Sequence, residues 1–262
     1  MMFDNKVYFF SNHLINAEIE HKVVEPLTVL DPNISVEEAY QVQLVTIQRK
    51  LEDGQRIVGK KIGLTSLAMQ QLLGVDQPDY GHLLDSMVVE NEGVIKFERV
   101  LQPKVEAEIA FVLKHDLIGP GVSSFDVLQA TEHVLAAIEI VDSRIKDWKV
   151  MLQDTIADNA SSGLFVLGNK PIAASDIDLA KVKMDLYKNG DFVNSGVGAD
   201  VLGNPANCVA WLANKLSEFG IALKAGEVIL SGAFSAAVDA APGDHFVARF
   251  TDLGEVSVSF SV

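Results

Sequence analysis

The spacing of hydrophobic positions predicts a helical first part of the chain. Residues 1–22 show the mixed face of a helix, and the two prolines within residues 24–33 predict a connection. Residues 35–38, Ser-Val-Glu-Glu, form a capping-box pattern that opens a second helix, which the apolar spacing carries to about Gly54. We therefore expect two substantial helices before any strand.

A short strand and a loop follow these helices. The sequence predicts a strand at residues 57–63, after which Thr65 or Ser66 caps a brief helix through Leu72. Residues 74–81, Gly-Val-Asp-Gln-Pro-Asp-Tyr-Gly, contain two glycines and a proline, so we expect a loop there.

Strand patterns dominate the second half of the chain. Capping residues predict helices at residues 123–134 and 204–220. Asn189-Gly190 between alternating apolar positions predicts a hairpin within residues 182–196. Further strands are expected at residues 104–113, 138–141, 164–167, 228–230, 246–250 and 256–260.

The order of these elements predicts an α+β fold. Helices come first and strands dominate afterwards, without the regular alternation of a βαβ protein. We expect a mixed β-sheet roll or barrel core with flanking helices. The 262 residues fit a helical N-terminal lobe, residues 1–55, followed by one α+β domain, residues 56–262.

Composition limits the partners and the compartment. The chain carries 21 Lys and Arg against 36 Asp and Glu, a formal charge of −15, so nucleic acid and anionic membranes are poor candidates as partners. An anionic substrate would need a local cation or a metal. The single cysteine, Cys208, cannot form an internal disulfide. Because we find neither a signal peptide nor a membrane-length apolar run, we expect a cytoplasmic protein.

The first candidate site is Glu106-Ala107-Glu108 in a predicted strand. Residues two apart on a strand share a face, so both carboxylates point the same way. A divalent cation such as Mg²⁺ would relieve the cost of burying them together. A solvated strand edge with Lys104 as counter-charge is the alternative.

Glu139 and Asp142 form a second acidic cluster. Glu139 lies between Ile138 and Ile140, so its side chain is expected to face inward, where it can supply a third oxygen ligand. A buried pair with Arg144 is the competing interpretation. The six histidines are scattered, which argues against a zinc site with nitrogen ligands.

Residues 59–65, Gly-Lys-Lys-Ile-Gly-Leu-Thr, are the third candidate. The glycines allow close backbone approach to a ligand, and a lysine beside them can bind a carboxylate or transfer a proton. Lys60 and Lys61 face opposite sides of the strand, so we expect one in solvent and the other inside. A glycine turn with surface lysines is the alternative, and the P-loop pattern is absent.

Two loops complete the set of candidates. Asp79 lies in the proline-containing loop, where it can serve as a general base or be a simple turn residue. Residues 154–163, Asp-Thr-Ile-Ala-Asp-Asn-Ala-Ser-Ser-Gly, offer small polar groups for a substrate carboxylate, with a capped turn as the alternative. The Gly-x-Ser-x-Gly elbow of serine hydrolases is absent.

The order of these motifs resembles that of one known family. The sequence runs GKKIGLTS, GVDQPDYG, LQPKVEAEIAFVL, EIVDSRIKDW and DTIADNASSG, then GNPANCVAWLANKL and KAGEVILSG. Together these motifs cover about residues 35–262 and resemble the hydratase/decarboxylase branch of the fumarylacetoacetate hydrolase superfamily. The resemblance implies an enzyme whose sheet core is of the fumarylacetoacetate hydrolase C-terminal type.

The resemblance also implies roles for particular residues. A Mg²⁺ or Mn²⁺ cofactor would be held by Glu106, Glu108 and Glu139. Lys61 and Asp79 would be catalytic. The implied substrate contacts are Gly63, Leu64, Leu84, Gln102 and Ser161.

The implied reaction is the addition of water to 2-hydroxypenta-2,4-dienoate, via 2-oxopent-3-enoate, to give 4-hydroxy-2-oxopentanoate in the meta-cleavage breakdown of aromatic compounds. The alternatives within the family are decarboxylation of 4-oxalocrotonate (2-oxohex-3-enedioate) and hydration of a longer 2-oxo-enoate. Residues 233–244 resemble the decarboxylases, whereas Asp79, residues 147–149 and residues 207–211 resemble the hydratases. Because decarboxylation needs no water activation, Asp79 favours the hydratase.

The resemblance implies a homo-oligomer and an association with the partner hydratase or decarboxylase of the pathway. A chain that mainly scaffolds such a partner is the non-catalytic alternative. The intact set of acidic ligands argues against that alternative. The expected ligand is a small 2-hydroxy-dienoate or 2-oxo-enoate, with no nucleic-acid or membrane partner.

Overall fold

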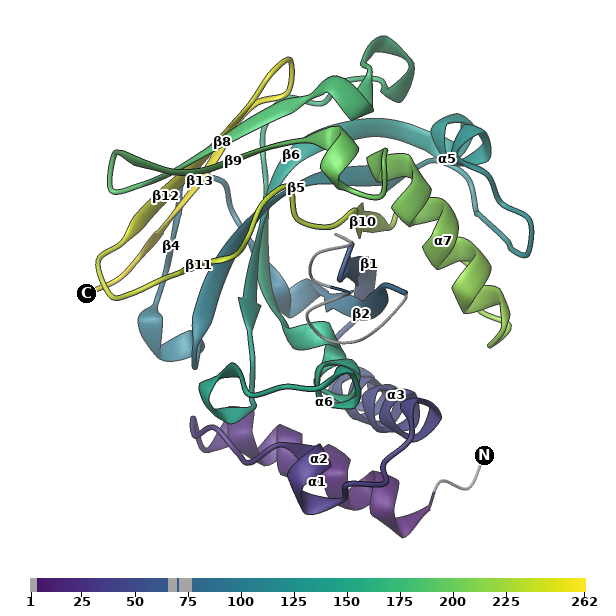
Figure 1. The fold of residues 1–262 in the computed structure, drawn as a ribbon, viewed down its shortest axis with the longest axis vertical. Helices are drawn as coiled ribbons and strands as arrows, with labels where there is room; N and C mark the ends of the chain where they lie inside the picture. The colour runs from purple at the N-terminus through teal and green to yellow at the C-terminus, as the bar shows by residue number, and fades with distance from the viewer. Residues whose placement is uncertain (1–3, 66–69, 71–76) are drawn as a thin grey trace.

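Three helices form the first part of the chain in the computed structural model, which describes residues 4–65, 70 and 77–262. They lie together at one end of the molecule (Figure 1) and are α1 (Asn5–Ile19), α2 (Leu27–Leu30) and α3 (Val36–Glu52). The predicted capping box is present, since Ser35 Oγ accepts from the Glu38 N–H and Glu38 accepts from the Ser35 N–H. The short α2 lies inside the stretch predicted to be a plain connection.

A large, curled sheet of eight strands forms the centre of the molecule (Figure 1). Its strand order is β2-β1-β10-β5-β6-β7-β3, with β11 paired to β5. Both parallel and antiparallel pairs occur, so the sheet is mixed. The strands are β1 (Ile57–Gly63), β2 (Asp79–Leu84), β3 (Val88–Val89), β5 (Pro103–Leu113), β6 (Thr131–Asp142), β7 (Ser162–Leu167), β10 (Val228–Leu230) and β11 (Val238–Asp239).

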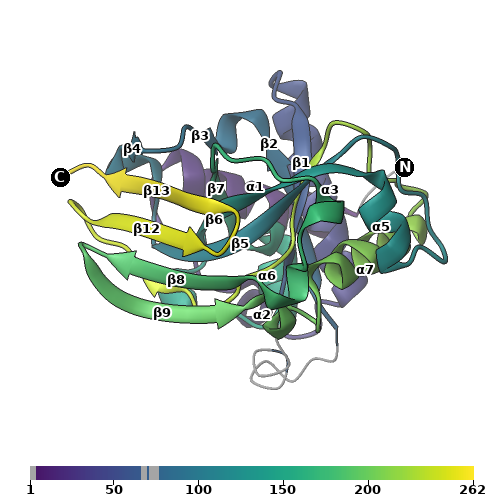
Figure 2. The same cartoon turned by 90° about the horizontal axis from the view of Figure 1, so that it is seen from above.

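A second sheet of five strands packs beside β6 and β7 (Figure 2). The predicted hairpin is confirmed between its strands β8 and β9, because Asn189 and Gly190 take the positive φ values, 55° and 89°, that a tight hairpin turn requires. The strands, in spatial order, are β4 (Gly93–Ile95), β13 (Gly254–Phe260), β12 (His245–Phe250), β8 (Lys183–Lys188) and β9 (Asp191–Val197).

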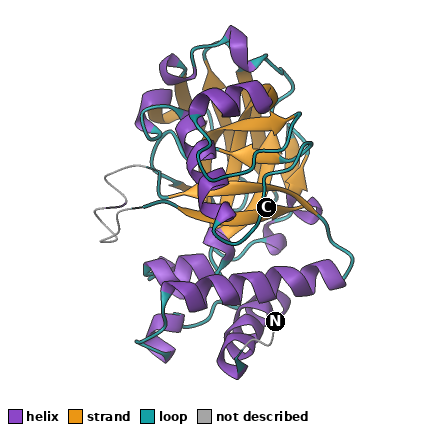
Figure 3. Cartoon of the chain, turned by 90° about the vertical axis from the view of Figure 1, so that its right-hand side faces the viewer, coloured by secondary structure: helices purple, strands orange, loops and turns teal. Residues whose placement is uncertain are grey.

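In the described part of the chain, three further α-helices flank the sheets, and Figure 3 shows helices beside the strands and the N-terminal helices at one end of them. They are α5 (Ser124–Ala130), α6 (Leu152–Ala157) and α7 (Pro205–Ser217). The Asn204 side chain caps α7 and Pro205 occupies its first turn, as predicted. Among the described residues, the helices are too short or too polar to cross a membrane.

Successive side chains of β5 point alternately toward the apolar core and toward the candidate site. Val105, Ala107 and Ile109 belong to the main core cluster, which also takes in residues of the second sheet and of α7. Glu106 and Glu108 therefore point to the opposite face. Ala110 follows them on that face and belongs to a smaller apolar cluster. The two carboxylates thus adjoin a second apolar surface of the same sheet.

The α+β class and the curled, mixed sheet confirm the predicted fold, but some local predictions are wrong. The predicted loop at 74–81 already contains the start of β2 at Asp79. The helix predicted over 123–134 ends at Ala130, and β6 begins at the next residue. The brief helix predicted through Leu72 lies largely outside the described residues.

Candidate active site and metal centre

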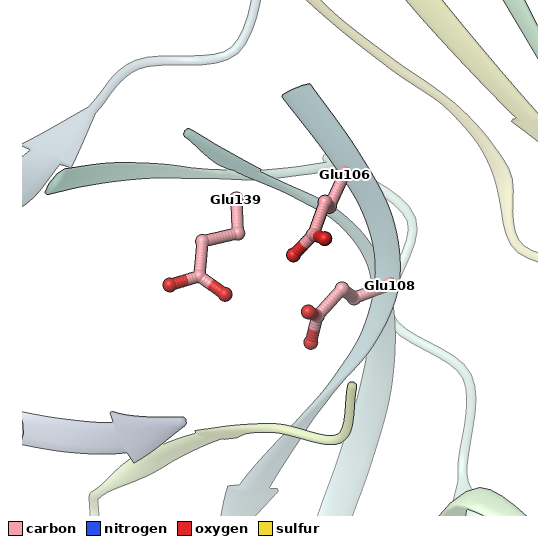
Figure 4. Close-up of side chains that lie close together, drawn as sticks. All are labelled: Glu106, Glu108 and Glu139. Carbon is pink, nitrogen blue, oxygen red and sulfur yellow. The ribbon is translucent and has the colours of Figure 1, made fainter. Parts of the chain in front are cut away.

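Three glutamates meet on the face of the large sheet opposite the main core. The antiparallel register of β5 and β6 places Glu106 directly opposite Glu139, and Glu108 lies two residues along β5. Their side chains point toward one another (Figure 4), and ligand atoms from all three lie within 4.8 Å of one another. The structure therefore brings the predicted metal ligands together.

Burial makes this cluster electrostatically unfavourable without a cation. Glu108 and Glu139 are buried, and burial together with repulsion from its neighbours raises the pKa of Glu106 to about 7. The Gly232 N–H donates to Glu108 Oε2 at 2.7 Å, whereas the two buried carboxylate oxygens of Glu139 accept no hydrogen bond from the described residues, and Oε1 has an ion pair with Lys61 at 3.3 Å. Converging carboxylate oxygens fit a hard divalent cation. The solvated-edge alternative for Glu106-Ala107-Glu108 is therefore wrong.

Lys61 is the cation that faces this cluster. It projects from β1, and its Nζ lies 3.3 Å from Glu139 Oε1. Burial alone would lower the pKa of Lys61, but the Glu139 and Asp79 carboxylates outweigh that effect and raise the pKa above its ordinary value. The side chain therefore stays an ammonium group.

Lys60 corrects the prediction that one of the two lysines faces solvent. It points to the other side of β1 and is only 3% exposed. Its Nζ is held by both carboxylate oxygens of Glu227, at 2.7 and 2.8 Å. The structure thus separates the two lysines as alternation requires, but both are buried.

Asp79 lies next to Lys61 at the start of β2, opposite Gly63. Thr155 Oγ1 donates to its Oδ2 at 3.2 Å, whereas Oδ1 is buried without a hydrogen-bond partner. A Cβ atom on Gly63 would lie 2.2 Å from Oδ1, so this position must be glycine for the carboxylate to keep its place. Burial raises the pKa of Asp79 above its ordinary value, although the Lys61 ammonium opposes this effect.

Side chains of residues 154–161 form hydrogen bonds with β2, which carries Asp79. Thr155 contacts Asp79, and the Asn159 side chain bonds both to the N–H and to the C=O of His82 in β2. Residues 159–161 all have positive φ, from 51° to 56°, which is strained for residues other than glycine. Sequence reasoning singled out this stretch but missed Thr155 as the partner of Asp79.

The other predicted substrate residues belong to four separate segments of the chain. Ser161 is buried, with its Oγ 3.4 Å from Asp158 Oδ2. The Gln102 amide donates to the C=O groups of Ser143 and Ile145 and so fixes the following loop. Leu64 has a positive φ of 57° and follows Gly63 directly, while Leu84 is buried at the far end of β2.

Asp142 and Arg144 have structural partners of their own. The Asp142 carboxylate accepts from the N–H groups of Leu101 and Gln102. Arg144 pairs with Asp158 at 2.5 Å, so the competing interpretation of a Glu139–Arg144 pair is wrong. Glu139 therefore remains available to the carboxylate cluster.

The fold and the carboxylate cluster define a known family. The sequence profile described as Fumarylacetoacetate (FAA) hydrolase C-terminal matches residues 65–260. The chain belongs to this family, and the predicted resemblance is confirmed.

The chain is similar to individual hydratases and to a decarboxylase over most of its length. A 2-hydroxypent-2,4-dienoate hydratase of Pseudomonas putida is 51% identical over 212 residues, which cover 80% of this chain and 96% of that protein. A 2-hydroxyhexa-2,4-dienoate hydratase of Comamonas testosteroni is 48% identical, covering 92% of both chains. The 4-oxalocrotonate decarboxylase of Pseudomonas putida G7, solved with magnesium and adipate, has a TM-score of 0.96 at 38% identity, covering 99% of each chain.

Proposed function

We propose that this enzyme is a metal-dependent hydro-lyase that converts 2-hydroxypenta-2,4-dienoate into 4-hydroxy-2-oxopentanoate. The observation that carries the proposal is the convergence of three glutamates, Lys61 and Asp79 on one buried face. Relatives that share about half of the sequence are hydratases of such dienoates.

Glu106, Glu108 and Glu139 are proposed to hold one Mg²⁺ or Mn²⁺ ion. The close approach of the three carboxylates, with Lys61 as the cation paired to Glu139, fits such an ion, and a solved relative contains magnesium. When bound, a divalent ion would polarise the 2-oxo group of the substrate and stabilise negative charge that develops there.

The proposed reaction has two steps. In the first, the 2-hydroxyl group loses its proton and C5 gains one, which gives 2-oxopent-3-enoate. In the second, water adds across the C3–C4 double bond, with its oxygen bonding to C4 and a proton to C3. The oxo group at C2 makes C4 electrophilic, so the addition follows from conjugation.

In this proposal, Lys61 donates hydrogen bonds and Asp79 transfers protons. The Lys61 ammonium stabilises the enolate oxygen by donating hydrogen bonds, because its neighbours keep it protonated. Asp79 exchanges protons with the substrate and orients the attacking water through Oδ1, the oxygen that accepts no hydrogen bond from the described residues. Gly63, Leu64, Leu84, Gln102 and Ser161 are proposed to contact or frame the substrate.

Product identification by NMR tests this function directly. Purified protein with Mg²⁺ is expected to convert 2-hydroxypenta-2,4-dienoate into 4-hydroxy-2-oxopentanoate and to leave 2-oxohex-3-enedioate largely unchanged. Faster loss of CO₂ from the second compound would make the enzyme a decarboxylase instead. The presence of Asp79, an acid able to activate water, favours hydration.

The carboxylate cluster predicts opposite pH dependence for the metal-free and the metal-bound protein. Folding raises the pKa of Glu106 from 4.5 to about 7, so its stabilising effect is complete below pH 4.5 and is lost as the pH rises through 7. For Glu106 alone this lowers the Tm of the metal-free protein by about 5 °C across the window. His82, whose pKa folding lowers from 6.5 to about 3, acts in the opposite direction, so the prediction concerns the difference between the metal-free and the metal-bound protein, in which the His82 contribution cancels.

Saturating Mg²⁺ is expected to reverse this trend, because the ion binds the deprotonated carboxylates and releases protons. Thermal unfolding followed by circular dichroism, with EDTA or with MgCl₂, measures both curves. Parallel curves under the two conditions would contradict metal binding at the three glutamates.

A further inference from the structure

The face of β5 that carries the glutamates is partly exposed at its Lys104 end, which we call the mouth of the site. Glu108 is buried, Glu106 is partly exposed, and the Lys104 side chain is 25% exposed. This face of the strand is therefore buried at Glu108 and partly exposed at Glu106 and Lys104. Because Lys61, Asp79 and Glu139 are buried, Lys104 lies on the partly exposed side of the cluster.

Lys104 is neutralised at this mouth by Asp239. The register of β11 and β5 places Asp239 directly opposite Lys104, so the two side chains share a face. The Lys104 Nζ lies 2.6 Å from Asp239 Oδ1 and 5.3 Å from the centre of the Trp148 ring. The indole N–H of Trp148 donates to the Gln102 C=O, which holds the ring in position.

The main chain of Asp239 is also fixed. Lys188 Nζ donates to its C=O at 2.9 Å, and the next N–H, that of Ala240, donates to the Pro103 C=O at 3.0 Å. Lys188 pairs with Asp244, so it does not add free positive charge at the mouth. Residues 147–149 resemble the hydratases and residues 233–244 resemble the decarboxylases. Both stretches therefore contribute a side chain that contacts Lys104.

We propose that Asp239 sets the substrate class of this site by neutralising Lys104, so that the site favours monoanionic 2-oxo-enoates over dicarboxylates. The proposal rests on the proposed binding of the substrate's 2-oxo acid end at the three glutamates. Lys104 is two residues, about 7 Å, from Glu106 along β5. This span is comparable to the separation of the two carboxylates in an extended six-carbon diacid.

The charges at the mouth then discriminate between monoanionic substrates and dicarboxylates. The second carboxylate of a diacid has to compete with Asp239 for Lys104, and it also approaches Glu106. A substrate with an uncharged methyl or methylene end does not compete with Asp239 for Lys104 and is not repelled by Glu106. Because Asp239 is 83% exposed, the competition takes place in water, and the discrimination amounts to a few fold.

The test compares adipate with pentanoate as competitive inhibitors of dienoate hydration in saturating Mg²⁺. In Asp239→Asn, the ratio of the pentanoate inhibition constant to the adipate inhibition constant is expected to rise about fivefold. The matched control is Asp178→Asn, which removes the same charge from an exposed ion pair with Lys181 and should leave the ratio unchanged. The double variant Asp239→Asn/Lys104→Gln should return the ratio to that of the native enzyme.

Each outcome decides the proposal. A ratio that stays at the native value in Asp239→Asn, or a rise that persists without Lys104, would overturn it. Failure of the native protein to hydrate the dienoate would instead overturn the proposed function. In that case the same ratio, measured by calorimetric titration of the Mg²⁺-loaded protein, still reports on Lys104 and Asp239.

Discussion

Replacing Glu106 with glutamine is expected to lower kcat/KM for dienoate hydration by about a thousandfold or more, through loss of the metal. Within the described residues, the Glu106 carboxylate has no hydrogen bond or ion pair, so the substitution leaves protein contacts intact. It also removes one of several mutually repelling carboxylates. We therefore expect the metal-free variant to be as stable as the native protein, or more stable.

Two measurements separate loss of metal from loss of fold. Calorimetric titration with Mg²⁺ or Mn²⁺ should show much weaker binding to Glu106→Gln, while its Tm in EDTA should not fall. Glu227→Gln is the control for the loss of a carboxylate outside the cluster, since Glu227 pairs with Lys60 on the other side of β1. Its metal binding should remain that of the native protein. Full activity of Glu106→Gln would refute the metal assignment.

Lys61→Met is expected to reduce turnover by about a thousandfold, because it removes the ammonium that stabilises the enolate. It also leaves Glu139 as a buried, uncompensated charge, which costs about 3 kcal/mol of stability without metal. Added Mg²⁺ should recover much of that stability, because the ion neutralises Glu139, yet it should not recover activity.

The neighbouring lysine provides a matched comparison. Lys60→Met breaks a similarly buried ion pair, with Glu227, and should cost comparable stability. Its turnover, measured at a temperature where the protein is folded, should remain near that of the native enzyme. If both variants lose turnover equally, the effect of Lys61 is structural and its catalytic role is wrong.

Local signals in the sequence were sufficient for most helices and strands but not for β2. The capping box at Ser35 and the Asn-Gly turn at 189–190 act within a few residues, and both are present. Gly81 was assigned to a loop, whereas in β2 its lack of a side chain admits the Asn159 C=O, which a Cβ would approach to 2.3 Å. A glycine required by a segment 78 residues away cannot be distinguished locally from a turn glycine.

The site shows the same division between local and long-range information. Alternation predicted that Glu106 and Glu108 share a face, and it separated Lys60 from Lys61. The flanking isoleucines predicted that Glu139 faces inward as a possible third ligand, but the choice of this role over a pair with Arg144 depended on family resemblance, because the register of β5 and β6 is a tertiary property. The partners of Lys60 and Asp79, Glu227 and Thr155, were missed since each lies far along the chain.

The hydrogen bonds of α6 connect the N-terminal helices to Asp79. Asp154 accepts from both the N–H and the hydroxyl of Thr28 in α2, and the next residue, Thr155, holds the Asp79 carboxylate. Two adjacent residues therefore connect α2 to Asp79, the acid proposed to transfer protons. We expect substitutions in α2 that break the bonds between Thr28 and Asp154 to shift Asp79 and to change turnover without a contact to the substrate.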